Sequence, residues 1–325
     1  MTNGIAERKS GITFESLANQ YGSVFLLIPI LAFFTAFQPR ILSLNNLMNV
    51  GSQLVMLGLL TIGQMFVILT GNFDLSVAGN CVLCSVITAL MLNTSIGVVP
   101  SMFVGVAVGT VIGVLQGMIA TRFRLSAFMV TVASMFLLRG VAFLITDGVA
   151  IPSPISYTRV ALATVFGIPV IVLFLILCFI IAAVVLSRTA FGRNIYAIGS
   201  NVVAARRCGI KVNRVLLSAM IVSGLCAGVS GVILASRLMS GQPNAVRTYD
   251  MSSIAAVILG GASVSGGKGS VFGTLIGLLI LGFLDNGLGL LQVSPYLQQI
   301  AIGATIVFAV IIDSIRTNFL AAKKA

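Results

Sequence analysis

The chain has no histidine, few charged residues and only seven acidic ones, and these absences exclude several kinds of protein. Without histidine it lacks the commonest metal ligand and general base among side chains. Cys81-x-x-Cys84 stands alone within an apolar run, so no zinc-ligand spacing is present either. The five cysteines are odd in number, and all except Cys208 lie in apolar runs, as packing residues do. We therefore expect no catalytic site, no metal and no cofactor.

The low charge accompanies a large apolar fraction. Only 8% of the residues are charged while 58% are hydrophobic, and the mean hydropathy is +1.13. A soluble globular protein carries about 25% charged residues. A spanning helix needs about 20 apolar residues, so the chain has room for roughly ten spans. The apolar runs are too long for barrel strands, which alternate over about ten residues. We expect an all-α, polytopic membrane helix bundle that forms one transmembrane domain over residues 1–325.

The apolar runs predict ten spans with interruptions. They are expected at 21–38, 48–69, 75–92, 97–120, 126–146, 167–187, 213–236, 252–266, 270–285 and 296–313. Residues 1–20 are polar and lack a cleavable signal pattern, which predicts a cytoplasmic N-terminal segment. An even number of spans then predicts a cytoplasmic C-terminus.

The net charge of +12 is distributed as in membrane proteins and not as in nucleic-acid-binding proteins. The predicted outer segments hold Arg40, Arg159, Arg237 and Arg247. The predicted inner segments hold more cations, which satisfies the positive-inside rule. These are Arg8, Lys9, Arg122, Arg124, Arg188, Arg193, Arg206, Arg207, Lys211, Arg214, Lys268, Arg316, Lys323 and Lys324.

Two spans are interrupted by turn-forming residues, at 71–76 and at the glycine-rich run 260–269. Asp74 in the first break is able to cap the helix that follows. Irregular backbone at membrane depth is tolerated only where protein buries it or water wets it. The breaks therefore indicate either a transport pathway or tight turns at the membrane edge. A separate pattern places glycine at every fourth residue, which lets helices approach closely in lipid. It comprises Gly105, Gly109, Gly113 and Gly117, Gly224 and Gly228, and Gly273 and Gly277.

The longest polar interruption lies between Arg188 and Arg214, with six cations and no acid. Ser200 or Asn201 is a good N-cap for a short helix over 202–208, and Gly209 suits the position that ends it. Arg206 and Arg207 fall in its last turn, where cations complement the helix dipole. A helix this short needs packing to be stable. The pattern predicts a cytoplasmic docking surface over 188–212; the alternative is a topological anchor that touches anionic lipid.

The glycine-rich run 260–269 invites comparison with an ATP-binding loop but does not match one. The motif G-x-x-x-x-G-K-[ST] would need glycine at 262 and serine or threonine at 269. The chain has Ala262 and Gly269 at these positions. We therefore do not expect this polypeptide to hydrolyse ATP by itself.

Four sequence blocks resemble those of ABC sugar permeases of the ribose type. The run 68–77, ILTGNFDLSV, is similar to the family signature ILTGGIDLSVG, with Asn72 in place of a glycine and Ala78 before Gly79 as departures. The other blocks are GRNIYAIG at 192–199 with its continuation to Ile210, AAVILGGAS at 255–263 followed by GGKG at 266–269, and LGFLDNGL at 281–288.

The resemblance implies a multi-pass permease subunit in the bacterial plasma (inner) membrane that imports a monosaccharide. It also implies partners: a cytoplasmic ABC ATPase, a periplasmic or lipid-anchored sugar-binding protein, and a second permease protomer, identical or paralogous. The lipid bilayer surrounds them, and no nucleic acid is expected. The residues expected to couple to the ATPase are Gly192, Arg193, Asn201, Ala204, Ala205, Arg206, Arg207 and Gly209.

Polar residues within predicted spans are candidates for the translocation pathway, because such side chains normally face protein or water. For Arg139, either Asp147 or Asp74 is a conceivable partner. The loop 147–167 is the first choice for contact with the binding protein. The pathway candidates are Asn72, Asp74, Gln64, Arg139, Asp285 and Asn286, with Gln53 and Gln116 as further ones.

Two other kinds of transporter compete with this interpretation. A permease for branched-chain amino acids or nucleosides shares the general architecture, although the sugar-type blocks disfavour it. An ion-coupled carrier would have to use Asp74 and Asp285, the only acids suitably placed. An intramembrane enzyme is disfavoured, because the sequence has no catalytic constellation.

Overall fold

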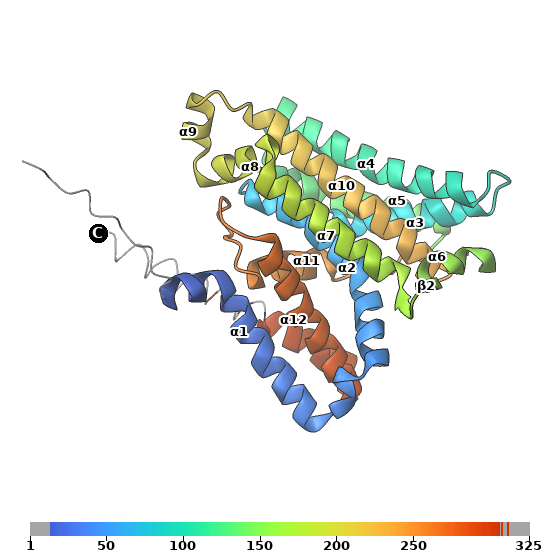
Figure 1. The fold of residues 1–325 in the computed structure, drawn as a ribbon. Helices are drawn as coiled ribbons and strands as arrows, with labels where there is room; N and C mark the ends of the chain where they lie inside the picture. The colour runs from blue at the N-terminus through green and yellow to red at the C-terminus, as the bar shows by residue number, and fades with distance from the viewer. Residues whose placement is uncertain (1–13, 306, 308–310, 312–325) are drawn as a thin grey trace, which may run out of the picture.

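The computed structural model describes residues 14–305, 307 and 311, and it is a bundle of α-helices (Figure 1). Among the described residues, six helices are long and apolar enough to cross a membrane. They are α2 (Leu44–Leu69), α4 (Val98–Arg122), α5 (Ala127–Thr146), α7 (Val170–Arg188), α10 (Val212–Arg237) and α12 (Val271–Leu290). The predicted helical membrane fold is thereby confirmed.

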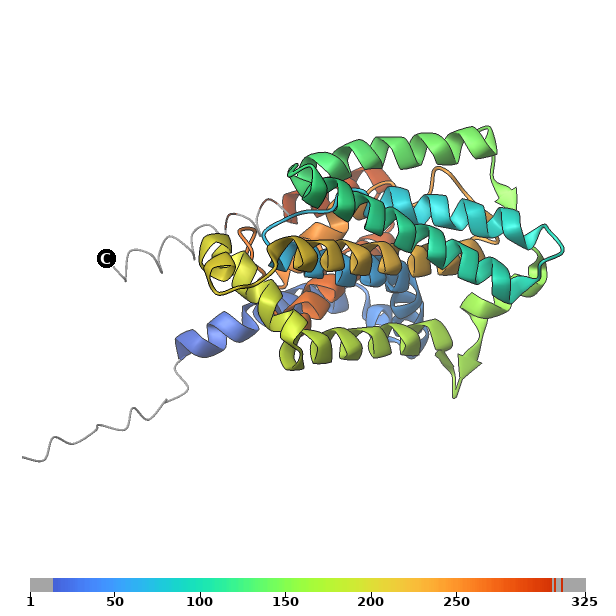
Figure 2. The same cartoon turned by 90° about the horizontal axis from the view of Figure 1, so that it is seen from above.

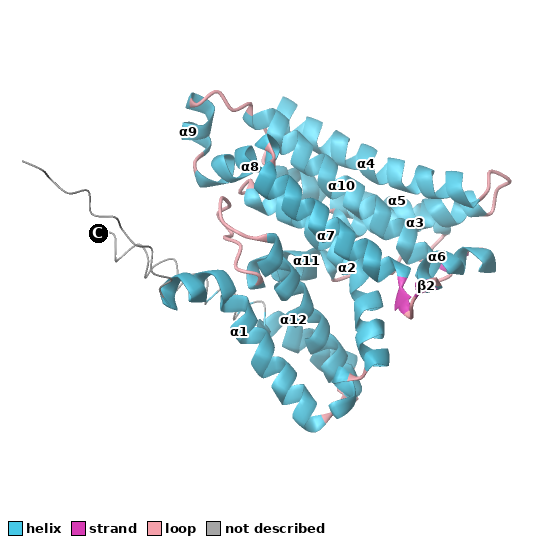
Figure 3. Cartoon of the chain, viewed as in Figure 1, coloured by secondary structure: helices cyan, strands magenta, loops and turns pink. Residues whose placement is uncertain are grey.

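Shorter helices complete the bundle. Of α1 (Phe14–Phe37) the apolar part is 24–37, and α3 (Val77–Leu92) and α11 (Tyr249–Leu259) are apolar along their length. Residues 295–305 are also helical. Figure 3 separates these helices from the loops that join them. The remaining short elements are η1 (Pro39–Leu42), η2 (Ile155–Thr158), α6 (Arg159–Leu162), α8 (Ala190–Ser200) and α9 (Val202–Arg207).

The helix bounds differ from the predicted spans mainly at the breaks. The span predicted at 252–266 is a helix only to Leu259, because Gly260 ends it and Gly261 takes a left-handed conformation with φ of 84°. The first helix begins at Phe14, within the predicted polar segment. Arg8, Lys9, Arg316, Lys323 and Lys324, and part of the span predicted at 296–313, lie outside the described residues.

The recurring glycines bring α4 and α10 into direct backbone contact, as the spacing predicts. A β-carbon at Gly109 would lie 2.6 Å from the Cα of Gly228, and one at Gly113 would overlap the carbonyl oxygen of Met220. No side chain fits between these helices, so α10 is fixed against α4 along its length. This contact positions both ends of α10 for the sites described below.

Two sets of short elements lie at opposite ends of the long helices (Figures 1 and 2). At one end α8 and α9 lie next to each other, and α1 begins on that side. At the other end lie α6 and two small two-stranded sheets. In one, β1 (Ile151–Pro152) pairs antiparallel with the distant β4 (Ser240–Gly241); in the other, β2 (Thr164–Val165) and β3 (Ile168–Pro169) form a hairpin.

The loop predicted at 147–167 contains most of these short elements, and together they form an ordered layer, which we call the cap, over this end of the bundle. Tyr157 is buried within it and donates a hydrogen bond to the carbonyl oxygen of Val232 at 2.8 Å. Burial raises the pKa of the Tyr157 phenol, which keeps it protonated as this donor.

Candidate functional site

The basic segment folds into two short helices with side-chain caps. The Thr189 hydroxyl accepts from the Gly192 N–H at 3.1 Å at the start of α8, and the Asn201 side chain accepts from the Ala204 N–H at 2.9 Å at the start of α9. Gly209 adopts φ of 81° beyond α9. The predicted capped helix and its glycine stop are therefore present.

The cations of this segment face away from the bundle. Arg193, Arg206 and Arg207 are exposed, and so are Asn201 and Ala204, whereas Ala205 is buried and holds α9 in place. Val202 and Val203 are 41% and 63% exposed. The exposed face of α9 therefore combines two arginines with two valines, which suits an acidic, partly apolar groove.

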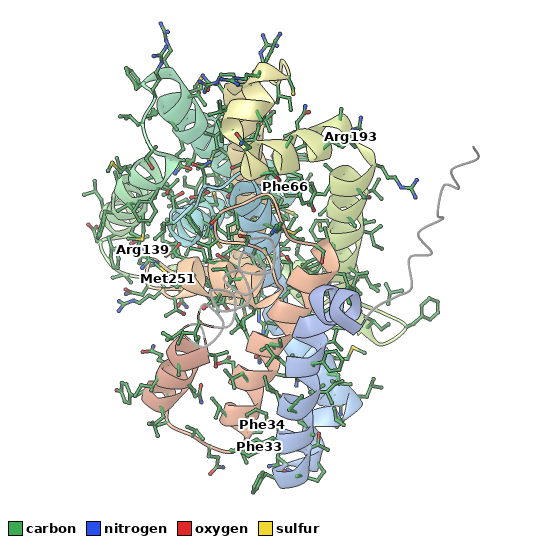
Figure 4. The ribbon with its side chains drawn as sticks, turned by 90° about the vertical axis from the view of Figure 1, so that its left-hand side faces the viewer. Phe33, Phe34, Phe66, Arg139, Arg193 and Met251 are labelled. Carbon is green, nitrogen blue, oxygen red and sulfur yellow. The ribbon has the colours of Figure 1, made fainter. Side chains whose placement is uncertain are left out.

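Helix α8 attaches this exposed helix to the membrane helices. Its Ile195 and Ile198 are fully buried, and Phe191 stacks on Phe66 of α2 with ring centroids 6.1 Å apart. Phe66 lies beneath α8 in Figure 4. Gly192 is packed so tightly that a β-carbon there would overlap the backbone of Leu186. Helix α8 therefore has a rigid base on α2 and α7.

The last turn of α8 meets both helix breaks at one point, which we call the glycine junction (Gly71, Gly199, Gly266 and Gly267). A β-carbon at Gly199 would overlap the carbonyl oxygen of Leu69 and the nitrogen of Gly267. One at Gly266 would lie 2.5 Å from the nitrogen of Gly71. The Gly267 N–H donates to the Leu69 carbonyl at 3.0 Å. Three segments distant in sequence thus touch through their backbones.

A side-chain hydrogen bond reinforces the junction. The Tyr196 hydroxyl on α8 donates to the carbonyl oxygen of Gly269 at 3.0 Å. Burial raises the pKa of the Tyr196 phenol, so the donor proton is retained at physiological pH.

The polar residues at the first helix break, residues 71–76, form hydrogen bonds with other groups of the protein. The Asp74 carboxylate accepts from the Ser76 N–H and hydroxyl and from the Ser223 hydroxyl, at 2.6–2.9 Å. The Gln64 amide, oriented as its surroundings require, donates to the Asp74 carbonyl at 2.9 Å and accepts from the Asp74 N–H at 3.2 Å. Both side chains are buried. Asp74 therefore stabilises the turn before α3, which begins at Val77 and not at Leu75 as expected.

Two further polar residues near this break also form hydrogen bonds within the protein. Asn72 donates to the hydroxyl of Thr70, and Gln116 donates to the hydroxyl of Ser76.

Arg139 of α5 pairs with Asp250, the second residue of α11, and not with Asp147 or Asp74 as considered from the sequence. The Nη2–Oδ2 distance is 2.8 Å, and the Asp250 side chain is only 5% exposed. In Figure 4, Arg139 lies beside the beginning of α11, which Met251 marks. The other Asp250 oxygen accepts from the Ala78 N–H at 2.7 Å. One buried carboxylate thus ties the start of α3 to α5 and α11.

A cavity of about 590 Å³ lies along the same helices that end at the junction. Along α2 the nearest lining residue, Leu57, is 12 positions from Leu69 at the junction, or ~18 Å. Its walls come from α2, the end of α10, residues 242–252 with the start of α11, the second half of α12, and residues 295–302. Polar groups on these walls include Gln53, Arg237, Gln242, Thr248, Tyr249, Ser252, Asp285, Gln298 and Gln299.

The predicted pathway residues therefore separate into groups. Asp285 and Gln53 line the cavity. Asn286, next to Asp285, instead forms a reciprocal amide pair with Asn46 that clamps α12 to α2. Sequence reasoning missed Arg237, Tyr249, Gln298 and Gln299, because each is an ordinary residue near a span end. For Gly199 a signal existed, since it ends one family block and its junction partners lie in two others.

Comparisons with known proteins agree with the sequence blocks. The family model described as "Branched-chain amino acid transport system / permease component" matches residues 46–310. The ribose import permease protein of Haemophilus influenzae is 37% identical over 307 residues, covering 93% of this chain and 94% of that protein. The ribose import permease protein of Bacillus subtilis is also 37% identical, covering 96% and 98%.

A third relative is the L-arabinose transport system permease protein of Escherichia coli, which is 35% identical with coverages of 96% and 95%. No solved structure matches the chain. The four blocks, the helical membrane fold and these full-length relatives agree, and the chain belongs to the monosaccharide-type permeases of ABC transporters.

Proposed function

We propose that the chain is the permease subunit of an ATP-driven importer that moves a monosaccharide across the bacterial plasma membrane. The observation that carries the proposal is the connection from the exposed basic helix α9, through α8 and the glycine junction, to the helices that line the cavity. A permease that receives force from a separate motor needs such a connection. The full-length relatives named for ribose and arabinose favour a sugar as the solute.

In this proposal α9 docks into a groove of a cytoplasmic ABC ATPase, with Arg193, Arg206 and Arg207 facing acidic groups. Residues 188–212 form the coupling segment. The backbone course of α8 and α9 in this segment depends on Gly192, Asn201, Ala204, Ala205 and Gly209. Closure of two ATPase subunits on ATP would move α8 and, through the junction, the ends of α2 and α11. Two permease protomers would enclose the pathway.

The proposed orientation has both termini and α9 in the cytoplasm and ten spans over the single domain 1–325. The cap over 147–169 and the strand β4, which pairs with it, then face outward, where a sugar-binding protein would dock. The position of α9 and this cap at opposite ends of the bundle supports the orientation (Figure 1). The cation asymmetry of the sequence supports it as well.

Charge reversal of α9 tests the docking. The double variant Arg206→Glu/Arg207→Glu should reduce co-purification of the ATPase and ATP-driven sugar uptake about tenfold or more, because removing a desolvated partner of a charge pair costs about 2–5 kcal/mol. Both arginines are exposed, so the variant should fold normally. Arg40→Glu, at an exposed arginine outside both the coupling segment and the 147–169 cap, is the matched control. Retained ATPase binding and uptake in the double variant would refute the docking surface.

A further inference from the structure

Several polar groups of the cavity have no protein partner. Among the described residues, the carboxylate of Asp285 and the side-chain amides of Gln53 and Gln299 make no hydrogen bond or ion pair, although all three line the cavity and are exposed to it. Their neighbours differ: Asn286 is paired with Asn46, and Gln298 donates to the carbonyl of Val293. The unbonded groups therefore converge on the cavity with their hydrogen-bonding capacity free.

The free groups match the chemistry of a neutral polyol. A carboxylate accepts hydrogen bonds from two hydroxyl groups, and each amide both donates and accepts. Leu54, Leu57 and Leu281 supply apolar wall that can cover carbon-bound hydrogens of a sugar ring. The volume of about 590 Å³ falls within the about 300–1,000 Å³ of small-molecule pockets.

The charge of the cavity argues against an anionic ligand. Arg237 is the one cation among the lining residues and Asp285 the one anion, so the formal charges cancel. The Arg237 guanidinium already donates to the carbonyl oxygen of Ser52. A sugar phosphate would bring a charge of about −2 close to the free carboxylate, which repels it.

We propose that Asp285, Gln53 and Gln299 form a sugar-recognition site within the permease itself. The proposal rests on the proposed function and extends it: the membrane subunit selects neutral monosaccharides by direct hydrogen bonds and is not a passive conduit. Asp285 acts as the main acceptor, because hydrogen bonds to a charged group are stronger than those between neutral groups.

Direct binding to the purified, full-length permease in lipid nanodiscs tests the site without any partner protein. Saturation-transfer NMR would be recorded with D-ribose, L-arabinose, D-ribose 5-phosphate and L-leucine as probes. We expect the two neutral sugars to bind and the phosphate and leucine not to. Asp285→Asn keeps the shape of the side chain but removes its charge, and should weaken sugar binding about tenfold. Asp147→Asn is the matched control, because Asp147 is an exposed carboxylate outside the cavity with φ of 48°, which asparagine tolerates.

The possible results of this experiment distinguish failure of the recognition site from failure of the proposed function. Sugar signals that fall in Asp285→Asn and persist in Asp147→Asn support the site. Equal signals in both variants, stronger binding of leucine, or no sugar binding by the wild type would overturn it. ATP-driven sugar uptake by wild-type cells, measured alongside, reports on the proposed function alone. Uptake without sugar binding would therefore reject only the recognition site.

Discussion

Replacing Gly199 with alanine should nearly abolish ATP-driven uptake while the permease still folds and binds its ATPase. Gly199 is in a helix, where alanine is intrinsically favoured by about 1 kcal/mol. The added methyl group, however, would overlap the Leu69 carbonyl oxygen and the Gly267 nitrogen. Overpacking of this kind costs about 1–3 kcal/mol, and both neighbours are backbone atoms that cannot rotate away. The junction must therefore open, and we expect uptake to fall about tenfold or more.

The measurement compares uptake and ATP turnover in proteoliposomes that contain the whole transporter. Gly289→Ala is the matched control, because a β-carbon there would have no atom within 4 Å. Tyr196→Phe is a milder variant that removes only the hydrogen bond to Gly269 and should lower uptake less. If Gly199→Ala transports as well as Gly289→Ala, the junction does not transmit the movement.

Breaking the Arg139–Asp250 pair should produce the largest loss of stability. Arg139→Leu leaves the Asp250 carboxylate, 5% exposed, with the Ala78 N–H but without its cation. Removing one partner of a buried pair costs about 3–5 kcal/mol, since the remaining charge is desolvated and uncompensated. We expect a marked decrease in the thermal unfolding temperature of the purified permease in detergent.

The double variant Arg139→Leu/Asp250→Asn distinguishes charge from shape. Asparagine can still accept from the Ala78 N–H, so the double variant should be more stable than Arg139→Leu alone. Arg247→Leu, which removes an exposed arginine, should unfold close to the wild-type temperature. A double variant that is no more stable than Arg139→Leu would contradict the assignment of the loss to an unpaired charge.

Structural features that depend on neighbouring residues in the chain could be predicted from the sequence. Contacts between segments far apart in the chain could not. The α9 helix and its cap at Asn201 follow from short-range hydrogen bonding, and the α4–α10 contact follows from glycine spacing on single helices. Helix ends at the glycine breaks are predicted less closely by the sequence: α11 stops at Leu259, seven residues before the expected end at 266.

The partners of the buried charges depended on the fold. Asp250 lies just outside the span predicted at 252–266, so its pairing with Arg139, 111 residues away, had no signal in one sequence. The glycine junction likewise requires three blocks to meet in space. The cavity residues Tyr249 and Gln299 become conspicuous only when helices from both halves of the chain surround them.

The account depends on α9 lying in the cytoplasm under an ATPase, and the native thiol of Cys208 reports this directly. Cys208 is exposed at the end of α9, whereas Cys81 and Cys84 are buried and Cys178 and Cys226 are partly buried. A membrane-impermeant maleimide should label Cys208 in inside-out vesicles stripped of the ATPase and not in intact spheroplasts, with Cys208→Ser as the control. Restoring the ATPase should then protect the thiol. Labelling of Cys208 from the outside of intact spheroplasts would contradict the orientation, the docking and the coupling together.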